Sequence, residues 1–526
     1  MSNTPKSKRV LAFALVVLML AVLFAGCGGG SQSTASTGST STASQASTGS
    51  STAASSTAAP KDDGPATKVT LVSMTSGDSS AAPDVSAEVS KISKEKINVE
   101  LNITLINQGS YKDQLNLMLS SGEDLDIFLA GLASPLATYV NNGQIIPLDD
   151  LMAQYGSSIY EALPIEYIEA GRVSGELYGL ATNRDLANYY GFFMRKDLCK
   201  KYDIDYENIH DLDALEEALI KVRDGEPGMY PVASGSGGSM VSSWGWDALN
   251  DRLGVLMNCG LTDLNVVNLY ETDEYRDFVT RMRKWEQMGI IMPDAANNPD
   301  TAEANMKAGK AFGGFGHLKP NTYLTKARSS THEIAIAEII PAFATTSNVQ
   351  GLIWAIATNS KAPDKAMQML NLMYEDPDIT NLTIFGIEGT HWKFVDEANA
   401  IINYADGVDA MNTTYTPVLG WMWPNQFIGH IWEGDEPDVW EVLDNFNRSA
   451  NKSMAMGFAF DNANVKNEVT ACMSVLDKYH NSLMCGSIDP ETTLDQFNKE
   501  LYDAGLQNII DEKQKQLDEW AAVNKK

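Results

Sequence analysis

The chain of 526 residues is strongly acidic, with 68 Asp and Glu against 39 Lys and Arg and a formal net charge of −29 at pH 7. A surface of this sign repels phosphate backbones and anionic headgroups, which argues against nucleic-acid binding. Hydrophobic residues make up 44% of the chain, and this share and the length predict two or three domains with large cores.

The N-terminus has the pattern of an export signal. Three basic residues precede an uncharged apolar run over 10–25, which is short for a membrane span and ends in small residues. Phe-Ala-Gly-Cys at 24–27 resembles the lipobox of bacterial lipoproteins, although Phe24 stands where that pattern prefers Leu. We therefore expect a signal peptide over 1–26 and lipidation of Cys27, with ordinary secretion or an uncleaved anchor as alternatives.

A low-complexity linker follows the cysteine. Residues 31–59 are only Ser, Thr, Ala, Gly and Gln, so this stretch offers no large apolar side chain to bury. We expect the whole segment 27–66 to be a disordered tether. It would hold the remaining chain near a membrane while leaving it free to reorient.

Beyond residue 66, strand-like and helix-like runs alternate. The first predicted strands and helices are strand 68–74, helix 84–96, strand 98–104, helix 111–122 and strand 124–130. Further along, the predicted elements are strands 332–340 and 352–358 and helix 364–376. Strands that alternate with helices predict an α/β fold with largely parallel sheets.

The cysteines and histidines predict neither a metal site nor a cofactor. Apart from Cys27, the chain has Cys199, Cys259, Cys472 and Cys485, none in a CxxC pair, and its six histidines lack metal-ligand spacing. Cys472 and Cys485 fall in or beside one predicted helix, which would hold them roughly 20 Å apart unless it breaks. We expect free, mostly buried thiols.

Several stretches, in their order along the chain, resemble the family 1 extracellular solute-binding proteins of ABC importers. These stretches are LNLMLSSGEDLDIFLAG (115–131), GQIIPLDDLM (143–152), GELYGLATNRD (175–185), GFFMRKDLCKKYDID (191–205), NIHDLDALEEALIKVRDGEPGMYPVA (208–233) and MKAGKAFGGFG (306–316). The C-terminal part resembles a lipoprotein subgroup with an additional domain of unknown function. Its matching stretches are NLTIFGIEGTHWKFV (381–395), FNRSANKSMAMGFAFD (446–461) and the helix that leads to GSIDP (486–490).

The resemblance implies a two-lobed periplasmic-binding-protein-like fold of type II, with solute bound in a cleft between the lobes. Lobe 1 would comprise 67–183 and 335–376, and lobe 2 would comprise 184–334 and 377–526, including the subgroup-specific region. The crossing strands would lie near 180–190 and 334–343. Hinge closure around the solute would create the form that docks on the permease.

Sugar capture needs aromatic faces and planar polar side chains, and five parts of the chain supply them. The candidate ligand-binding residues are Asn183, Arg184 and Asp185 in TNRD, Trp244 and Trp246 in SSWGWD, Trp421, Trp423, Asn425 and Gln426 in WMWPNQF, Asp126, and Phe315 and His317 in GGFGH. Each has a structural alternative: the charged pair could brace the hinge, the tryptophans could be core, and Asp126 could be a cap. We expect the charge-rich helix 511–520 to be exposed to solvent, apart from one packed Trp.

No catalytic arrangement stands out. HEIAI (332–336) has Ile336 where a zinc-binding HExxH needs its second histidine, and ASGSGG (233–238) lacks the G-x-S-x-G spacing. DNANVKNE (461–468) lacks the glycine and the terminal glutamate of a calcium loop. Acidic pairs are too numerous for two of them to indicate a glycosidase.

The sequence therefore predicts a monomeric, lipid-anchored protein on the outer face of the cytoplasmic membrane. We expect it to capture a carbohydrate, an oligosaccharide in the first instance, and to deliver it to ABC permease subunits. Capture of a peptide or amino-acid-like solute is the alternative within the same class. A surface glycosidase and a non-transporting sensor or adhesin are the alternatives from other classes.

Overall fold

The structure is a computed structural model that describes residues 64–235, 240, 244–416 and 420–525. The expected signal peptide, Cys27 and the Ser/Thr/Ala stretch 31–59 lie outside the described residues. Within the described part of the chain, no helix has both the length and the apolar character needed to cross a membrane.

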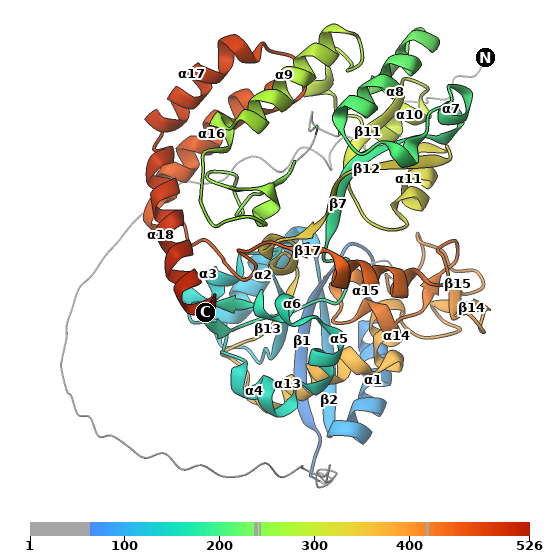
Figure 1. The fold of residues 1–526 in the computed structure, drawn as a ribbon. Coiled ribbons are helices and arrows are strands. Elements are labelled where there is room, and N and C mark those ends of the chain that lie inside the picture. Colours follow the sequence, from blue (N-terminus) through green and yellow to red (C-terminus); the bar gives the residue numbers. More distant parts are fainter. Residues whose placement is uncertain (1–63, 236–239, 241–243, 417–419, 526) are drawn as a thin grey trace, which may run out of the picture. The chain divides into compact units, whose positions relative to one another are not determined.

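Two hydrophobic cores organise residues 64–525 (Figure 1). The first core, which defines lobe 1, takes its buried residues from 69–187 and 344–456. The second core, which defines lobe 2, takes them from 189–337 and 455–517. Each core contains a five-stranded sheet flanked by helices, so the two-lobed α/β architecture predicted from the sequence is confirmed.

The sheet of lobe 1 has the order β2-β1-β3-β13-β6. Its strands are β1 (Thr67–Thr75), β2 (Val99–Asn107), β3 (Ile127–Ala130), β6 (Leu180–Ala181) and β13 (Ile353–Ile356). The helices of this lobe are α1 (Ala82–Ile97), α2 (Gln108–Ser121), α3 (Leu136–Asn141), α4 (Asp149–Tyr155), α5 (Ser157–Ala162), α6 (Ile165–Glu169), α12 (Thr346–Gln350) and α13 (Pro363–Glu375). A short hairpin, β4 (Arg172–Val173) with β5 (Glu176–Leu177), follows α6.

Lobe 2 has the sheet order β17-β12-β7-β11-β8. Its strands are β7 (Asn188–Arg195), β8 (Tyr230–Val232), β11 (Ala311–Leu318), β12 (Ile334–Ala344) and β17 (Asn451–Lys452). A separate ribbon joins β9 (Trp246–Asp247) to β10 (Leu256–Met257). The helices between these strands are α7 (Lys196–Lys201), α8 (Leu212–Gly225), α9 (Asp273–Gln287), α10 (Ala302–Lys307) and α11 (Thr322–Ser330).

Both sheets are mixed, which corrects the largely parallel sheets that the alternation of strands and helices predicts. In lobe 1, β1 pairs in parallel with β2 and β3, but β13 is antiparallel to β3 and β6. In lobe 2, β7 is antiparallel to both β11 and β12. The strands that break the parallel pattern, β7, β12 and β13, adjoin the interlobe crossings, where the chain enters a sheet from the other lobe.

The segment after α13 packs mainly with lobe 1, which differs from the lobe boundary expected from the sequence. Its elements are α14 (Pro377–Phe385), β14 (Trp392–Asp396), β15 (Ile401–Tyr404), β16 (Ile431–Trp432) and α15 (Val439–Ser449). Ile379, Trp392 and Trp423 belong to the first core, so the chain returns to lobe 2 only at β17 and beyond.

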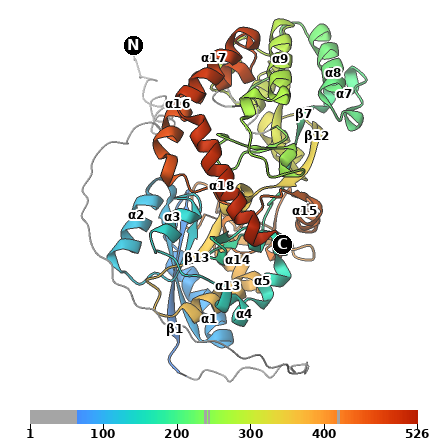
Figure 2. The same cartoon turned by 60° about the vertical axis from the view of Figure 1, so that its left-hand side comes forward.

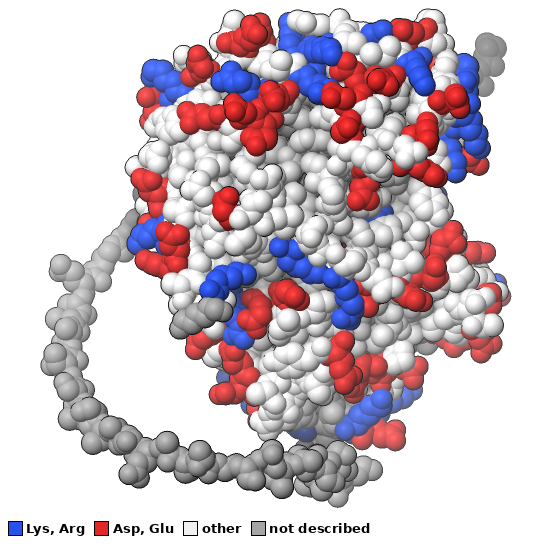
Figure 3. Space-filling view, viewed as in Figure 1, with Lys and Arg blue, Asp and Glu red and all other residues white. Residues whose placement is uncertain are grey.

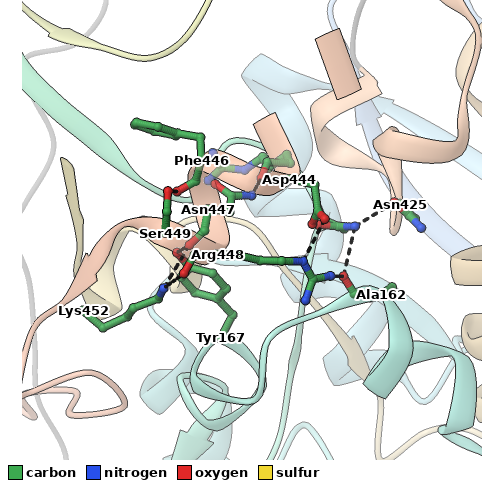
Figure 4. Close-up of polar contacts among 11 residues, drawn as sticks. Ala162, Tyr167, Asn425, Asp444, Phe446, Asn447, Arg448, Ser449 and Lys452 are labelled. Atoms are coloured by element: carbon green, nitrogen blue, oxygen red, sulfur yellow. Dashed lines mark hydrogen bonds and ion pairs between the residues drawn. The ribbon is translucent and has the colours of Figure 1, made fainter. Parts of the chain in front are cut away.

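Three crossings connect the lobes: between β6 and β7, between β12 and α12, and between α15 and residue 455. Asn447 of α15, labelled in Figure 4 beside Tyr167 and Lys452, ties the first and third crossings together through its side chain. Its Oδ1 accepts the backbone N–H of Leu186 at 2.8 Å, and its Nδ2 donates to the carbonyl of Arg184. The Tyr167 hydroxyl and the Lys452 ammonium donate to the Asn447 carbonyl at 2.7 and 3.0 Å.

The C-terminal part consists of three helices, of which the first two pack on α9 of lobe 2 and the third packs on the first two (Figure 2). They are α16 (Lys466–Met484), α17 (Pro490–Asp503) and α18 (Leu506–Asn524). Cys472 lies within the unbroken α16 and Cys485 caps its end. Both are buried free thiols, as are Cys199 and Cys259, so the expectation for the four cysteines is confirmed.

Candidate functional site

A cavity of about 480 Å³ lies where the first two crossings meet the β9–β10 ribbon. Residues from β7, β11, β12, α12, α16 and the segment after β9 surround it. Its lining is Asn188, Tyr190, Trp246, Asp247, Ala248, Asn250, Arg252, His317, Phe343, Thr345, Ser347, Asn348 and Asn481.

The lining combines neutral hydrogen-bonding groups with aromatic rings. Four asparagines, a threonine and a serine supply amides and hydroxyls, each of which can both donate and accept. Only two lining residues, Asp247 and Arg252, carry charge. This neutrality contrasts with the acidic chain as a whole. On the face drawn in Figure 3 the charged residues likewise gather toward the two ends, with mostly uncharged surface between them.

The aromatic wall takes one ring from each of three neighbouring strands, β7, β11 and β12. The Tyr190 ring lies edge-on to His317 with centroids 4.3 Å apart, and tilted against Phe343 at 5.5 Å. Tyr190 and Phe343 are buried. His317 is exposed toward the cavity, yet the surrounding protein disfavours a charged ring, and this desolvation lowers the pKa of His317 to about 4. The imidazole is therefore neutral at neutral pH.

The stretch from the last residue of β9 toward β10, which we call loop 247–254, has an unusual backbone. Leu249, Asn250 and Arg252 have φ angles of 43°, 81° and 64°, in the left-handed region that non-glycine residues rarely occupy. Two of these three residues line the cavity. Such conformations persist only where the surrounding structure imposes them, and they concentrate at functional sites.

A second cavity of about 260 Å³ adjoins the first, and the two share Asn250 and Ser347. The wall on the lobe 1 side comes from Gly131 and helix α3. At Gly131, whose φ is 96°, a Cβ would lie 2.3 Å from the carbonyl oxygen of Gln350, so only glycine fits this approach of β3 to α12. Together the two cavities form one elongated site between the lobes, which we call the cleft.

Two residues predicted from the sequence line the cleft. Trp246 is 1% exposed and presents only a small part of its ring to the first cavity. His317 contributes to the wall described above. Trp244 lies outside the cavity lining: it is half-buried between Phe278 and Phe315, with both ring-centroid distances at 5.3 Å. Phe315 is itself buried in the core of lobe 2.

The TNRD residues lie at the first crossing, beside the cleft. The Arg184 guanidinium donates to the carbonyls of Asp185 and Asn348, at 2.6 and 2.9 Å, and burial lowers its pKa. The Asp185 carboxylate pairs with Lys319 of lobe 2 at 2.6 Å. This geometry matches the hinge-brace alternative, and neither side chain appears among those that line the two cavities.

The WMWPNQF segment is brought to the same crossing. The Asn183 amide donates to Oδ1 of Asn425 at 3.0 Å, and the backbone N–H of Gln426 donates to the Asn183 carbonyl. Trp423 is buried against Trp354 with centroids 6.0 Å apart, whereas Trp421 is 36% exposed. None of these residues lines the two cavities.

Asp126 directly precedes β3, whereas the cleft lies at the other end of this strand, where Gly131 follows it. Its carboxylate accepts the Thr70 N–H at 2.8 Å and the Ser360 hydroxyl at 2.5 Å, as in the capping alternative.

Most lining residues were not among the sequence candidates. Asn188 and Tyr190, and likewise Phe343 and Thr345, stand two apart near the end of a strand, so each pair faces one side. This two-residue spacing could have identified the four residues as cleft-lining, but only after the crossings had been located. Asn250 and Asn481 carried no comparable signal, because their place in the cleft depends on the loop backbone and on the packing of α16.

Comparison with known proteins links this site to a family. The profile of the bacterial extracellular solute-binding proteins matches residues 72–378, and that of a domain of unknown function (DUF3502) matches 454–522. The chain is 26% identical over 437 residues to a carbohydrate ABC transporter substrate-binding protein of Streptococcus pneumoniae, covering 82% of this chain and 87% of that protein. Lipoprotein LipO of Bacillus subtilis is 25% identical over 210 residues, 38% of this chain and 40% of that protein.

Solved structures agree on the fold. The N-glycan transport solute binding protein NgtS of S. pneumoniae superposes with a TM-score of 0.74 at 24% identity, covering 88% of this chain and all of that one. A solute-binding protein of Bifidobacterium longum infantis, described as HMO binding and associated with an ABC transporter, gives a TM-score of 0.58 at 16% identity over 86% and 99% of the two chains. At these identities the structural likeness speaks for the fold alone.

Proposed function

Since the chain belongs to the bacterial extracellular solute-binding proteins, we propose that its cleft captures a neutral oligosaccharide and delivers it to an ABC-type importer. The observation that carries this proposal is the lining of the first cavity, where neutral amides and hydroxyls surround an aromatic wall. Sugars offer hydroxyl groups to such amides and apolar ring faces to such aromatics.

The size of the cleft supports a solute longer than one sugar. The first cavity alone falls within the range of about 300–1,000 Å³ that is usual for small-molecule sites. The second continues it past Asn250 toward α3 of lobe 1. Two similar proteins agree with this class of solute: the carbohydrate ABC transporter substrate-binding protein of S. pneumoniae, and NgtS, whose structure is in complex with Man5GlcNAc.

A peptide or amino-acid-like solute fits the cleft less well. Charged termini need charged partners, and the charged residues that line the cleft are already engaged by the protein itself. In the second cavity, Asp251 pairs with Lys513, and Asp461 accepts from the Asn141 amide and the Ala463 N–H. The first cavity has Asp247 and Arg252. Asp247 accepts the Leu249 N–H at 3.1 Å and the Ser453 hydroxyl, while Arg252 donates to His480 at 3.2 Å. We therefore propose a binding protein and not an enzyme, so no oligosaccharide should be cleaved on incubation.

Thermal denaturation with a solute panel tests this proposal. Neutral oligosaccharides, Man5GlcNAc among them, are compared with short peptides and free amino acids at matched concentrations. A true solute at one hundred times its Kd should stabilise the folded protein by about 2.7 kcal/mol. A response to peptides with none to any sugar would contradict the proposal, and release of reducing ends would reveal a glycosidase.

The family is extracellular, and for this chain we further propose a lipid anchor at Cys27 and docking of a monomer on ABC permease subunits. The anchor rests on the Ala-Gly-Cys sequence at 25–27 and the featureless linker behind it. Replacement of Cys27 by Ser should release the protein into the medium or leave it unprocessed, with solute binding unchanged. Membrane retention of a correctly cleaved Cys27→Ser protein would overturn the anchor.

A further inference from the structure

Loop 247–254 contributes residues to both cavities from the lobe 2 side, as α12 and its flanking residues do from the lobe 1 side. Asp247 and Ala248 line the first cavity, Asp251 lines the second, and Asn250 lines both. The positive φ angles within it are unfavourable for side-chain-bearing residues. Something outside the loop must therefore hold it in this conformation.

The main restraint is Lys513 of α18, which is fully buried. Its ammonium group donates to the Asp251 carboxylate at 2.6 Å and to the carbonyls of Leu253 and Gly254, both at 3.0 Å. It also lies 4.9 Å from the ring centroid of Phe460, which lines the second cavity. All three donor hydrogens are directed into one short stretch of loop.

Lys513 occupies a position that packing alone would give to an apolar residue. On α18 it is three residues after Ile510 and four before Leu517, on the buried stripe of the helix. Desolvation lowers the pKa of Lys513, and the Asp251 charge opposes that shift. A buried ion pair is seldom more stabilising than well-packed apolar side chains, so this lysine calls for a reason beyond stability.

A second restraint comes from α16. His480 is buried, and its Nε2 lies 3.2 Å from a guanidinium nitrogen of Arg252, with its Nδ1 3.3 Å from the Tyr275 hydroxyl. Burial and the Arg252 charge lower the pKa of His480 to about 3. The ring is therefore neutral and accepts from Arg252. The next residue, Asn481, lines the first cavity itself.

We propose that the C-terminal helices, which match the domain of unknown function, form part of the solute site: Lys513 and His480 are positioning residues that hold loop 247–254 in its solute-binding conformation. The inference rests on the proposed function for its solute. On this account α16–α18 set the affinity through a loop outside their own sequence. A purely structural role would instead affect folding and leave the cleft of the folded protein unchanged.

Three variants of α18 separate these roles. Lys513→Met removes the charge and the three donated bonds while keeping a long side chain. Lys515→Met makes the same change at an exposed position of the helix, where the lysine only approaches Glu512 at 3.7 Å. Leu517→Ala damages the packing of the same buried stripe without removing a polar contact to the loop.

Hydrogen exchange of peptides that cover 247–254 is measured on each mature protein without solute. We expect Lys513→Met to speed exchange of these amides at least tenfold, and Lys515→Met to leave them unchanged. Unchanged loop exchange in a folded Lys513→Met protein overturns the inference, and so does an equal response in Leu517→Ala. This measurement needs no solute, so its result is independent of the proposed function.

Affinity is measured next with Man5GlcNAc. If another oligosaccharide of the panel gives a larger thermal shift, that oligosaccharide is used in its place. We expect at least tenfold weaker binding by Lys513→Met and wild-type binding by Leu517→Ala once folded. Equal affinities overturn the inference, whereas wild-type protein that binds no sugar counts against the proposed function. If Lys513→Met does not fold, His480→Phe takes its place, because it removes the acceptor for Arg252 and keeps a ring beside Tyr270 and Tyr275.

Discussion

The Ser347 hydroxyl donates a hydrogen bond of 2.7 Å to Oδ1 of Asn250, and the two residues stand on opposite sides of the cleft. Ser347 belongs to α12 of lobe 1, and Asn250 belongs to loop 247–254 of lobe 2. Both side chains are exposed and both line the two cavities. A solute that fills the cleft must pass this contact, so we expect these groups to exchange their mutual hydrogen bond for bonds to the solute.

Asn250→Gly should weaken solute binding about tenfold, which corresponds to about 1.4 kcal/mol and to one or two lost hydrogen bonds. Glycine keeps the backbone at a φ of 81° without strain, so the melting temperature should stay close to that of wild type. Asn258→Gly is the matched control, because Asn258 is also exposed, has a φ of 50° and lines neither cavity. Equal loss of affinity in both variants would remove Asn250 from the site.

His317→Ala should reduce affinity several-fold and leave stability nearly unchanged, because the ring is exposed on the aromatic wall beside Tyr190. With a pKa of about 4 the ring stays neutral, so wild-type affinity should be constant between pH 8 and pH 6. Calorimetric titration at several pH values measures both effects, with the exposed His210→Ala as control. A change of affinity centred near pH 6.5 that His317→Ala abolishes would contradict this description of the wall.

Acid should destabilise the protein partly through His480. Its pKa is about 6.5 in the unfolded chain and about 3 in the folded one, so between these values the unfolded state binds the extra proton. Stability from this group is complete above pH 6.5 and is lost as pH falls toward 3. Between pH 7 and pH 5 the loss should be about 2 kcal/mol.

Denaturant unfolding of wild type and of His480→Gln at these two pH values isolates the effect. Glutamine cannot take up the proton but can still accept from Arg252, so the variant should lose about 2 kcal/mol less on acidification. Identical losses in the two proteins would mean that His480 is not held neutral against Arg252 and Tyr275.

The hinge should depend far more on Asn447, which is labelled in Figure 4, than on the ion pair between Lys319 and Asp185 at the first crossing. Asn447→Ala removes the hydrogen-bond partner of the buried Leu186 N–H and that of the Arg184 carbonyl. We expect this loss to lower the free energy of unfolding by about 2–4 kcal/mol. Lys319→Met breaks a partly exposed bridge to Asp185 and should cost less than about 1 kcal/mol. Denaturant unfolding measures both costs, and a reversed order would refute this picture of the crossing.

The elements of lobe 1 could be predicted from the sequence because each carries its own periodic signal. The run KVTLVSM became β1, and the apolar spacing of DKAMQMLNLMYED became α13. The mixed pairing of the sheets could not be predicted, since it depends on how β7, β12 and β13 cross between lobes. No local pattern records the direction of a partner strand.

At the site, residue type was a better guide than residue role. TNRD does lie at a crossing, but the Arg184 guanidinium donates its hydrogen bonds to backbone carbonyls there and does not line the cavities. Only the three-dimensional surroundings decide which of these two roles the side chain takes. Helix 511–520 was expected to be a solvated face, and the structure corrects this at Lys513, which is buried. The spacing from Ile510 through Lys513 to Leu517 places the lysine on the apolar stripe of the helix and so indicates burial. The residue type argues the other way, because a lysine is seldom buried without a partner, and the sequence does not show that Asp251 is that partner.

The most direct test of the central claim is calorimetric titration of the mature wild-type protein and its Asn250→Gly and Asn258→Gly variants with the neutral oligosaccharide that gives the largest thermal shift. We expect saturable binding of one solute per chain with a micromolar Kd or tighter, a binding free energy of about −8 kcal/mol, and an affinity that is reduced only in Asn250→Gly. Binding that Asn250→Gly leaves intact would place the sugar elsewhere, and the absence of binding to every neutral oligosaccharide alongside binding to a peptide would contradict the claim outright.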